Sequence, residues 1–338
     1  MKILVLSHAF FPSMGGIEVN TEILCRNFTE AGHQVTLITN TPCEDYRDDF
    51  VFPVVRQPSF IKIFKMFLSA DIVFHNNPSF GIGYLSIFFN YKTIYAIRTW
   101  VARTNGELTL KDKIKQKLIC NGKNRIYISQ AISEHLPCAG VVIGNPYRDS
   151  VFVPKGKEVQ ENNFIFAGRL TPDKGVDLLI KAYSEIKNDY NLAGLSIAGN
   201  GGELKELIKL TEKLGIASEV KFLGKLNGVE LSKQYSQHKF IVVPSRWNEP
   251  FGNVALEGIA CGCVPIVSEG GGLKDAIGEC GLTFKNGDLL SLIKVMRLFL
   301  DSHELIQQKR SVFKKHLSKH SEKVVAASYL RVLEGISK

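Results

Sequence analysis

The chain alternates short apolar segments with helical segments over nearly its whole length, and no other feature restricts its possible folds as much. In the first half, the apolar segments predict strands, and the segments between them have helical periodicity. The predicted strands cover residues 3–7, 34–39, 71–75, 92–98, 125–129 and 141–144, and the predicted helices cover residues 17–30, 82–89, 111–120 and 130–136. Strands that alternate with helices form right-handed βαβ units, so this half predicts a parallel sheet covered on both faces.

A polar stretch from Asn145 to Asn163 interrupts the alternation, and we interpret it as a linker. The alternation then restarts. The further predicted strands are 164–168, 195–199, 220–224, 239–244, 264–267 and 282–284, and the further helices are 175–187, 202–214 and 251–261. From Gly287 onward the chain reads as helix and ends in an amphipathic run over 321–336.

This pattern predicts an α/β protein with two doubly wound, Rossmann-like domains. We expect the first domain at residues 1–148, the second at 149–318, and a helix at 319–338 that packs back on the first domain. Ligands of such sheets bind at the carboxyl ends of the strands, so we expect the binding site in the cleft between two facing domains.

Composition supports a globular protein, because 45% of the 338 residues are hydrophobic and 22% are charged. There is no window of about 18 uncharged apolar residues that would predict a membrane span. The apolar start of the chain is too short for a signal peptide and predicts a core strand. The seven cysteines include no C-x-x-C pair, so we expect reduced thiols, no metal site and a cytoplasmic location, with the inner face of the membrane as an alternative.

The balance of 42 basic and 33 acidic residues gives a net charge of +9. This charge is compatible with nucleic acid, an anionic membrane surface or a phosphorylated substrate as partner. We find no nucleic-acid-binding motif, so we do not expect nucleic acid.

Four turns rich in glycine or charge follow predicted strands. The first contains Gly15 and Gly16 and leads into a predicted helix. Paired glycines at such a turn allow close backbone approach to a ligand, although a single turn of this kind is also compatible with tight packing alone. It does not match G-x-G-x-x-G, which disfavours a nicotinamide cofactor. The other three turns contain Gly168, Gly199 with Asn200, and residues 270–272.

The turn after Gly168 also carries Arg169 and Lys174. Arginine offers a planar fork and lysine a point charge, which together suit a diphosphate. Exposed cations are common on any surface, but four such turns at strand ends point to one ligand-binding site.

The segment from Glu249 to Glu257 places two carboxylates eight residues apart. We predict a helix with Pro250 in its first turn, which leaves amides near Phe251 free to bind an anion. On a continuous helix the two Cα atoms would lie roughly 12 Å apart on nearly the same face. This spacing suits an elongated ligand with an anionic middle, such as a nucleotide diphosphate sugar, although two such glutamates also occur on ordinary solvated helices.

Taken together, these motifs resemble the retaining glycosyltransferases of family 4, which have the GT-B architecture of two facing Rossmann-like domains. The matching segments are S-x-x-F-x-P-x-x-G-G-x-E from Ser7 to Glu18, Gly32-His33-x-Val35, Gly168-Arg169-Leu170 with Lys174-Gly175, Ala198-Gly199-Asn200-Gly201, Pro244-Ser245, Glu249-Pro250-Phe251-Gly252, and Glu257-Gly258-x-Ala260-x-Gly262. The resemblance covers nearly the whole chain and is more specific in the second half.

The resemblance implies roles for the matching residues. Arg169 and Lys174 would hold the donor diphosphate. Glu257 would bind the ribose, and Glu249 would bind the hydroxyls of the donor sugar. Glu249, Arg169 and Lys174 would be the catalytic residues. The remaining expected substrate-binding residues are Gly15, Gly16, Arg98, Gly168, Gly199, Asn200, Phe251, Gly252, Asn253 and Val254.

The resemblance also implies a reaction, in which a sugar moves from a UDP- or GDP-linked donor to a glycan or lipid-linked saccharide in surface polysaccharide biosynthesis. It implies retention of configuration by front-face attack, no cofactor and no metal, and we find no D-x-D motif. The alternatives are a phosphorylase or epimerase on the same fold, and a subunit that only binds the nucleotide sugar.

One position departs from the family pattern. Relatives often have a histidine at the end of the strand that corresponds to residues 95–99, whereas this chain has Arg98. Arg98 either positions a phosphate or acidic acceptor or is a structural cation, and His75, at another strand end, is the rival for the histidine's role.

The segment from Ser59 to Leu68 is basic and rich in large apolar residues. It predicts either an ordinary helix that covers the sheet with Lys62 and Lys65 outward, or an interfacial helix that docks on anionic lipid.

Overall fold

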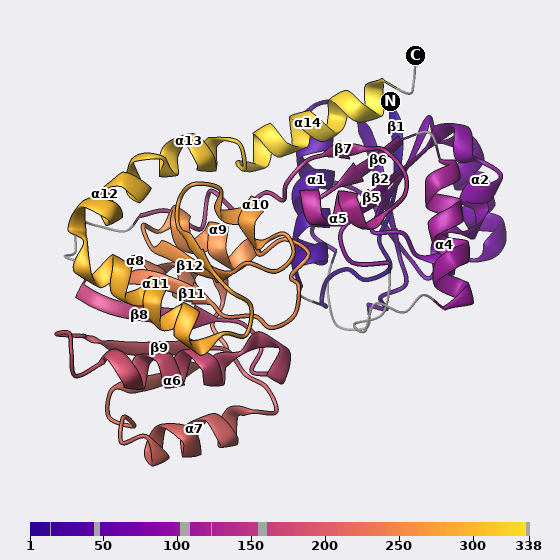
Figure 1. Cartoon of the computed structure of the whole chain (residues 1–338). Helices are drawn as coiled ribbons and strands as arrows, with labels where there is room; N and C mark the ends of the chain where they lie inside the picture. Colours follow the sequence, from indigo (N-terminus) through magenta and orange to yellow (C-terminus); the bar gives the residue numbers. More distant parts are fainter. Residues whose placement is uncertain (14, 44–47, 102–108, 123, 155–160, 336–338) are drawn as a thin grey trace. The chain divides into compact units, whose positions relative to one another are not determined.

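The computed structural model describes residues 1–13, 15–43, 48–101, 109–122, 124–154 and 161–335. The chain packs into two compact units, of which the first combines Met1–Pro146 with Glu322–Lys338 and the second is Tyr147–Ser321. Each unit contains its own sheet (Figure 1).

The first unit has a sheet of seven strands in the order β3-β2-β1-β4-β5-β6-β7. All neighbouring pairs are parallel. The strands are β1 (Lys2–Leu6), β2 (Gln34–Thr39), β3 (Val54–Arg56), β4 (Ile72–Asn76), β5 (Thr93–Ile97), β6 (Asn124–Tyr127) and β7 (Val141–Val142). The winding direction reverses between β1 and β4, which makes their carboxyl ends the place where such a sheet binds ligands.

Helices cover both faces of this sheet. They are α1 (Gly16–Glu30), α2 (Phe60–Ser69), α3 (Phe80–Gly83), η1 (Tyr84–Ile87), η2 (Asn90–Lys92), α4 (Leu110–Asn121), α5 (Gln130–His135) and α14 (Glu322–Glu334). Ile3 and Val5 of β1 pack in the core beneath α1 and α14, whereas Leu4 and Leu6 pack beneath α2. This alternation follows from the two-residue period of a strand.

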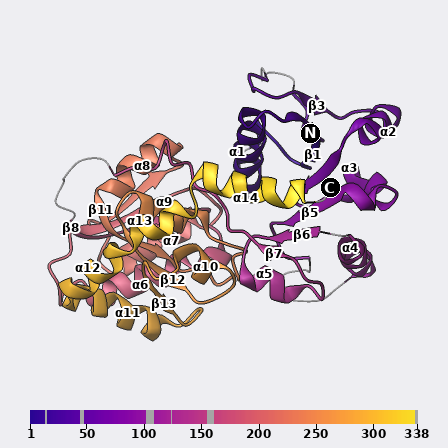
Figure 2. The ribbon, with the colours of Figure 1, turned by 90° about the horizontal axis from the view of Figure 1, so that it is seen from above.

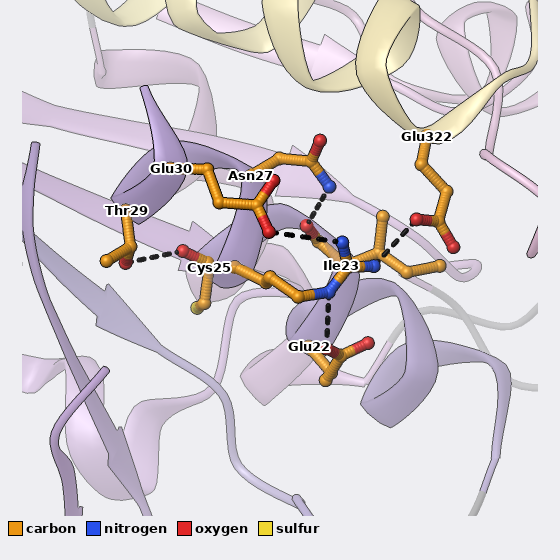
Figure 3. Close-up of polar contacts among 8 residues, drawn as sticks. Glu22, Ile23, Cys25, Asn27, Thr29, Glu30 and Glu322 are labelled. Atoms are coloured by element: carbon orange, nitrogen blue, oxygen red, sulfur yellow. Dashed lines mark hydrogen bonds and ion pairs between the residues drawn. The ribbon is translucent and has the colours of Figure 1, made fainter. Parts of the chain in front are cut away.

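The last helix belongs to the first unit although it lies at the end of the sequence. Figures 1 and 2 show α14 beside α1, and the two helices are in contact. Tyr329 of α14 is fully buried, with its ring 5.8 Å from that of Phe74. Arg26 of α1 donates a hydrogen bond to Glu322 at 2.6 Å, and Figure 3 shows Glu322 directed toward the part of α1 that carries Glu22 and Glu30.

The second unit has a sheet of six parallel strands in the order β10-β9-β8-β11-β12-β13. Its strands are β8 (Glu161–Ala167), β9 (Gly194–Ala198), β10 (Val220–Gly224), β11 (His238–Val243), β12 (Val264–Ser268) and β13 (Leu282–Phe284). Its helices are η3 (Pro172–Lys174), α6 (Val176–Ile186), α7 (Leu204–Lys213), α8 (Gly228–Ser236), α9 (Asn253–Ala260), α10 (Leu273–Ile277), α11 (Leu289–Asp301), α12 (His303–Ser311) and α13 (Phe313–Ser318). Here the winding reverses between β8 and β11.

The predicted fold class of two parallel α/β sheets with C-terminal helices is confirmed, but some elements differ from the prediction. Two elements, β3 and α8, were not predicted from the sequence. β3 has only three residues and no fully buried side chain, so its apolar signal is weak. For α8, Asn227 and Glu230 form a capping box that could have revealed the helix start. The single helix predicted at 82–89 is instead the short α3 followed by a 3₁₀ turn, η1.

The expectation that all cysteines are reduced thiols is wrong for one pair. Cys120, in α4, and Cys138, after α5, form a disulfide with Cα atoms 5.4 Å apart. The fold brings the end of α4 next to the loop after α5, and the spacing of 18 residues gave no local signal for this contact. Cys25, Cys263 and Cys280 are buried and form no disulfide.

Candidate functional site

Three segments meet at the carboxyl ends of β8 and β11 in the second unit. The first is the turn from Gly168 through η3 to α6, the second is the loop from Pro244 to Gly252, and the third is the turn before α10. The main-chain oxygen of Asp173 accepts hydrogen bonds from the amides of Arg246, at 2.8 Å, and Trp247, at 3.2 Å. The first two segments are therefore fixed to one another through their backbones.

Gly175 allows this close contact between the two segments. It has a φ of 65°, in the left-handed region, and ends η3 where α6 begins. A Cβ atom at this position would lie 2.1 Å from the main-chain oxygen of Pro244. Only glycine can occupy this place without displacing the loop after β11.

Lys174 and Glu249 meet at the centre of this arrangement. The Nζ of Lys174 lies 2.6 Å from Oε1 of Glu249, and the Ser245 hydroxyl donates to the same oxygen at 2.8 Å. The ammonium also lies 4.9 Å from the centroid of the Trp247 ring. Both charged side chains are mostly buried. The structure thus brings together a cation and a carboxylate that the sequence analysis had singled out 75 positions apart.

The backbone of Glu249 is held in place as well. It forms a parallel bridge with Gly271, and the amide of Gly272 donates to the main-chain oxygen of Glu249 at 2.7 Å. Gly271 has a φ of 67°, and a Cβ there would lie 2.2 Å from that oxygen. The glycine-rich turn that follows β12 therefore positions Glu249.

Arg169 differs from Lys174 in its exposure. Its side chain is 71% exposed, and its nearest ion pair is with Asp173, at 4.0 Å. A guanidinium in this state can turn toward an incoming anion at little cost, because no buried hydrogen bond has to break.

Helix α9 begins later than the sequence predicted. Its first residue is Asn253, after the N-cap Gly252, so Pro250 does not lie in the first helical turn and Glu249 lies outside the helix. The physical reason is the φ of 121° at Gly252, which no helix accommodates. The continuous helix predicted to join the two glutamates is therefore wrong, and the spacing of roughly 12 Å no longer follows from helix geometry. The backbone amides of the first turn of α9 therefore begin with those of Asn253 and Val254. Phe251, which precedes the helix, is buried.

Glu257 lies inside α9 and is partly buried. Burial raises the pKa of its carboxyl to about 7, an effect that the charge of Arg148 partly opposes. Among the described residues, none makes a hydrogen bond to this carboxyl group. A carboxyl group in this condition is available to a polar ligand.

The turns after β8 and β9 are joined through glycines. The amide of Gly168 donates to the Ala198 oxygen at 3.0 Å, and the amide of Leu170 donates to the Asn200 oxygen at 3.0 Å. Gly199 has a φ of 146°, and a Cβ there would lie 1.8 Å from the oxygen of Gly168. These glycines therefore allow the two turns to approach, in addition to any role toward a ligand.

The first unit has a cavity of about 370 Å³ at the corresponding place, beside the carboxyl ends of β1 and β4. It is lined by His8, Ala9, Ile17, Glu18, Asn76, Asn77, Pro78, Ser79 and Lys115. Lys115, which no sequence motif had indicated, lines this cavity, and burial lowers the pKa of its ammonium group. Gly15 and Gly16 end the loop after β1 and begin α1, the helix that carries Glu18.

Arg98 lies inside the first unit and is almost completely buried. Its Nε donates to Asn76 and its Nη1 to Asn145 at 2.7 Å, and the guanidinium lies 5.5 Å from the Tyr329 ring. Burial lowers its pKa, against the opposing effect of Tyr329. In this geometry Arg98 connects two strand ends to α14, and its contact with an acceptor stays a prediction.

His75 is also fully enclosed. Its Nε2 lies 2.6 Å from the Ser86 hydroxyl, and its ring lies 4.8 Å from that of Tyr95. Burial lowers its pKa to about 3, so the ring is neutral at physiological pH. These contacts are those of a packed side chain, and the rival role for His75 likewise stays a prediction.

No described helix is both long and apolar enough to traverse a bilayer. Within the described ranges, no three or more histidine, cysteine, aspartate or glutamate side chains gather in a way that could hold a metal ion.

Two parallel sheets, each wound in the Rossmann manner with polar groups at its switch point, define the GT-B class of fold. The model of the family described as "Glycosyl transferases group 1" matches residues 148–316. The chain therefore belongs to this family, glycosyltransferase family 4.

Individual relatives agree with this assignment. One uncharacterised glycosyltransferase of Methanocaldococcus jannaschii is 43% identical over 122 residues, which cover 36% of this chain and only 31% of that protein. A second one from the same organism is 27% identical over 302 residues, covering 82% of this chain and 81% of the relative. The solved structure of Anabaena HepE in complex with UDP-glucose superposes with a TM-score of 0.80 at 16% identity, covering 99% of this chain and 100% of that one, which shows a shared fold.

Proposed function

We propose that this protein is a retaining glycosyltransferase that transfers a sugar from a nucleotide-sugar donor, linked to UDP or GDP, to a glycan or lipid-linked saccharide. The observation that carries the proposal is the contact between Lys174 and Glu249 at the switch point of the second sheet, beside the start of α9. Family membership supports it, and so does the UDP-glucose bound by HepE, which has the same fold.

In this proposal the cations stabilise the leaving group. When the bond between the sugar and the diphosphate breaks, negative charge develops on the phosphate oxygen. Lys174, which is already oriented by Glu249, and the exposed Arg169 would contact this charge. Fixed charges that face developing charge are usually the largest contribution to catalysis.

Glu249 would position the donor sugar. Its Oε1 is occupied by Lys174 and Ser245, whereas no described residue forms a hydrogen bond with Oε2. Oε2 can therefore accept a hydrogen bond from a sugar hydroxyl. Because the carboxylate is held in an ion pair, we do not assign it the role of nucleophile.

Retention then follows from attack on one face. The acceptor hydroxyl would form its bond to the anomeric carbon on the side from which the diphosphate leaves, and the departing phosphate oxygen would take the hydroxyl proton. Glu257 would bind the ribose, and the first-turn amides of α9 would contact the phosphates. The acceptor would bind to the first unit, at the cavity beside β1 and β4.

We further propose that the reaction needs neither a metal nor a cofactor and belongs to surface polysaccharide biosynthesis at the cytoplasmic face of the membrane. The absence of a D-x-D motif from the sequence supports the first point. The second rests on the resemblance to bacterial glycan transferases.

Thermal unfolding with a panel of nucleotide sugars tests the proposal. A donor that binds only the folded protein stabilises it by about 2.7 kcal/mol at a hundred times its Kd. We expect one UDP- or GDP-sugar to raise the melting temperature and to be turned over with release of the nucleotide diphosphate.

Lys174→Ala should then lower turnover about 100-fold or more, as removal of a donor to developing negative charge does elsewhere. Lys205→Ala, on the exposed surface of α7, is the matched control and should leave turnover unchanged. If no nucleotide sugar binds, or if Lys174→Ala folds and retains full turnover, the proposal is wrong. Binding without turnover would instead indicate a subunit that only binds the donor.

A further inference from the structure

Helix α2 has apolar side chains on both of its sides. Ile63 and Phe67 point inward and are buried against the sheet. Phe60, Ile61 and Leu68 are exposed, with Ile61 at 66%. A helix that only covers a sheet presents polar residues to solvent, so the outward side of α2 needs another explanation.

The exposed apolar side chains of α2 continue onto the neighbouring turns. We call this set the aromatic surface, and it consists of Phe60, Ile61, Phe64, Leu68, Ile87, Phe88 and Tyr91. The Phe60 ring stacks on Tyr84 of η1 at 5.9 Å, and the Phe64 ring contacts Phe89 at 6.2 Å. Phe88, between η1 and η2, is 76% exposed. Contiguous apolar patches of this kind usually mark an interaction site.

The aromatic surface is built on a fixed frame. The ammonium of Lys92 is buried and donates hydrogen bonds to the main-chain oxygens of Phe67 and Ala70, both at 2.7 Å. These oxygens end α2, where a helix carries unpaired carbonyl groups and partial negative charge. Lys92 thereby ties η2 to the end of α2, and the exposed side chains project from a defined backbone.

Exposed lysines lie on α2, which carries part of the aromatic surface, and on α4. Lys62 and Lys65 are exposed on α2, which has no acidic residue. Helix α4 adds Lys111, Lys113 and Lys117, all exposed, and its one acidic residue, Asp112, is bonded to Thr109 in a capping box.

Helix α4 adjoins this region of the unit. Leu118 and Ile119 of α4 line a small cavity together with Tyr84 and Ile87. Figures 1 and 2 both show α2 and α4 on the side of the first unit away from α1 and α14, and Figure 2 shows α3 on the same side. The two helices that carry these lysines, α2 and α4, thus lie on one side of the unit.

We propose that the aromatic surface docks on a bilayer that contains anionic lipid. Large apolar side chains would enter the boundary between headgroups and acyl chains, while the lysines would remain at the level of the headgroups. Each lysine near such a surface adds electrostatic attraction. A protein partner or a second copy of the chain is less compatible with these residues, because lysine is depleted from protein–protein interfaces.

Vesicle sedimentation tests the proposal. The full-length protein is mixed with vesicles of phosphatidylcholine alone, or of phosphatidylcholine and phosphatidylglycerol in equal parts. We expect it to sediment with the anionic vesicles and to remain largely in solution with the neutral ones. Ile61→Ser with Phe88→Ser should weaken binding at least about tenfold, because two large apolar side chains no longer leave water. Lys62→Glu with Lys65→Glu should weaken it by a roughly similar factor.

Matched variants on the second unit provide the controls. Val229→Ser with Leu290→Ser removes two equally exposed apolar side chains, and Lys205→Glu with Lys209→Glu makes the same change in net charge. Both should bind vesicles like the unaltered protein. The proposal is overturned if the protein does not sediment with anionic vesicles. It is overturned as well if the two double variants, Ile61→Ser with Phe88→Ser and Lys62→Glu with Lys65→Glu, sediment as well as the controls. It is also overturned if light scattering shows a dimer that Ile61→Ser with Phe88→Ser dissociates while vesicle binding is unaffected.

Discussion

At the scale of single residues, two glutamates of the second unit have different surroundings: one forms an ion pair, and the other is a carboxyl group whose pKa is raised. Glu249 is paired with Lys174 at 2.6 Å and accepts a further hydrogen bond from Ser245. Glu257 has no such partner among the described residues, and burial raises the pKa of its carboxyl to about 7. In the proposed enzyme, the Glu249 carboxylate is held in place to orient a sugar. The Glu257 carboxyl group remains available to form a hydrogen bond with a ligand.

The raised pKa of Glu257 predicts how stability depends on pH. The folded state retains the proton up to about pH 7, whereas the carboxyl of the unfolded chain releases it near the ordinary glutamate pKa of 4.5. Between these values the folded state binds more protons, so the free energy of unfolding falls as the pH rises. We expect Glu257→Gln to abolish this part of the fall.

Urea unfolding at pH 5 and pH 8 measures the effect in both proteins. The Gln variant should gain stability over the unaltered protein at pH 8 and differ little from it at pH 5. An equal difference at both pH values would contradict the assigned pKa. Glu212→Gln, at an exposed position of α7, serves as a control for the charge change.

At the scale of elements, the loops after β8, β11 and β12 depend on glycines, because a side chain there would collide with the backbone of a neighbouring loop. The main-chain oxygen of Pro244 lies where a Cβ atom of residue 175 would be, and that of Glu249 lies where a Cβ atom of residue 271 would be. These contacts place Lys174 and Glu249 within hydrogen-bonding distance although they follow different strands. The local backbone geometry and the proposed chemistry are therefore linked.

We expect Gly175→Ala to impair both stability and donor binding. The new Cβ would collide with the Pro244 oxygen, and alanine is disfavoured at a φ of 65°. The combined cost of the positive φ and the displaced loop should be about 2–3 kcal/mol. Denaturant unfolding measures the stability, and the thermal shift produced by the donor measures binding.

Gly202→Ala is the matched control in the same unit, since a Cβ there meets nothing within 4 Å. It should change the stability by less than about 0.5 kcal/mol and leave donor binding intact. Equal behaviour of the two variants would show that the contact between Gly175 and Pro244 does not organise the loops.

At the scale of the whole molecule, the chain builds its first unit from both ends of the sequence. The second unit is continuous from Tyr147 to Ser321, and α14 then completes the core of the first. Val325, Tyr329 and Leu333 are buried with strands that come from the start of the chain. The two units therefore differ in how they should respond to loss of the C-terminus.

A chain that ends at Ser321 should lose stability in the first unit alone. Exposure of the three large side chains costs roughly 1.5–3 kcal/mol each. Their sum approaches the whole free energy of unfolding of an ordinary domain. We expect increased binding of an apolar dye and an early thermal transition. The second transition should remain and should still shift upward with the donor nucleotide, and a single cooperative loss of both transitions would contradict this prediction.

Much of the fold could be predicted because parallel strands are apolar throughout and alternate with helices. β2, β10 and β13 lie at the predicted residues, and most other predicted strands differ by a few residues at their ends. The start of α9 could not be predicted in this way, because glycine adopts positive and negative φ about equally readily and the sequence does not show which one Gly252 has. The disulfide between Cys120 and Cys138 depends on where α4 ends relative to the loop after α5.

The sequence by itself determined the two α/β sheets, the family motifs and the residue types at the strand ends. These properties depend on periodicity and local backbone chemistry, which are local along the chain. Only the tertiary structure decided that Lys174 and Ser245 bind the same oxygen of Glu249, that Arg98 is enclosed beneath α14, and that α2 exposes its second apolar side. Each of these depends on contacts between residues far apart in sequence, because burial and partner distance are fixed only when the elements pack.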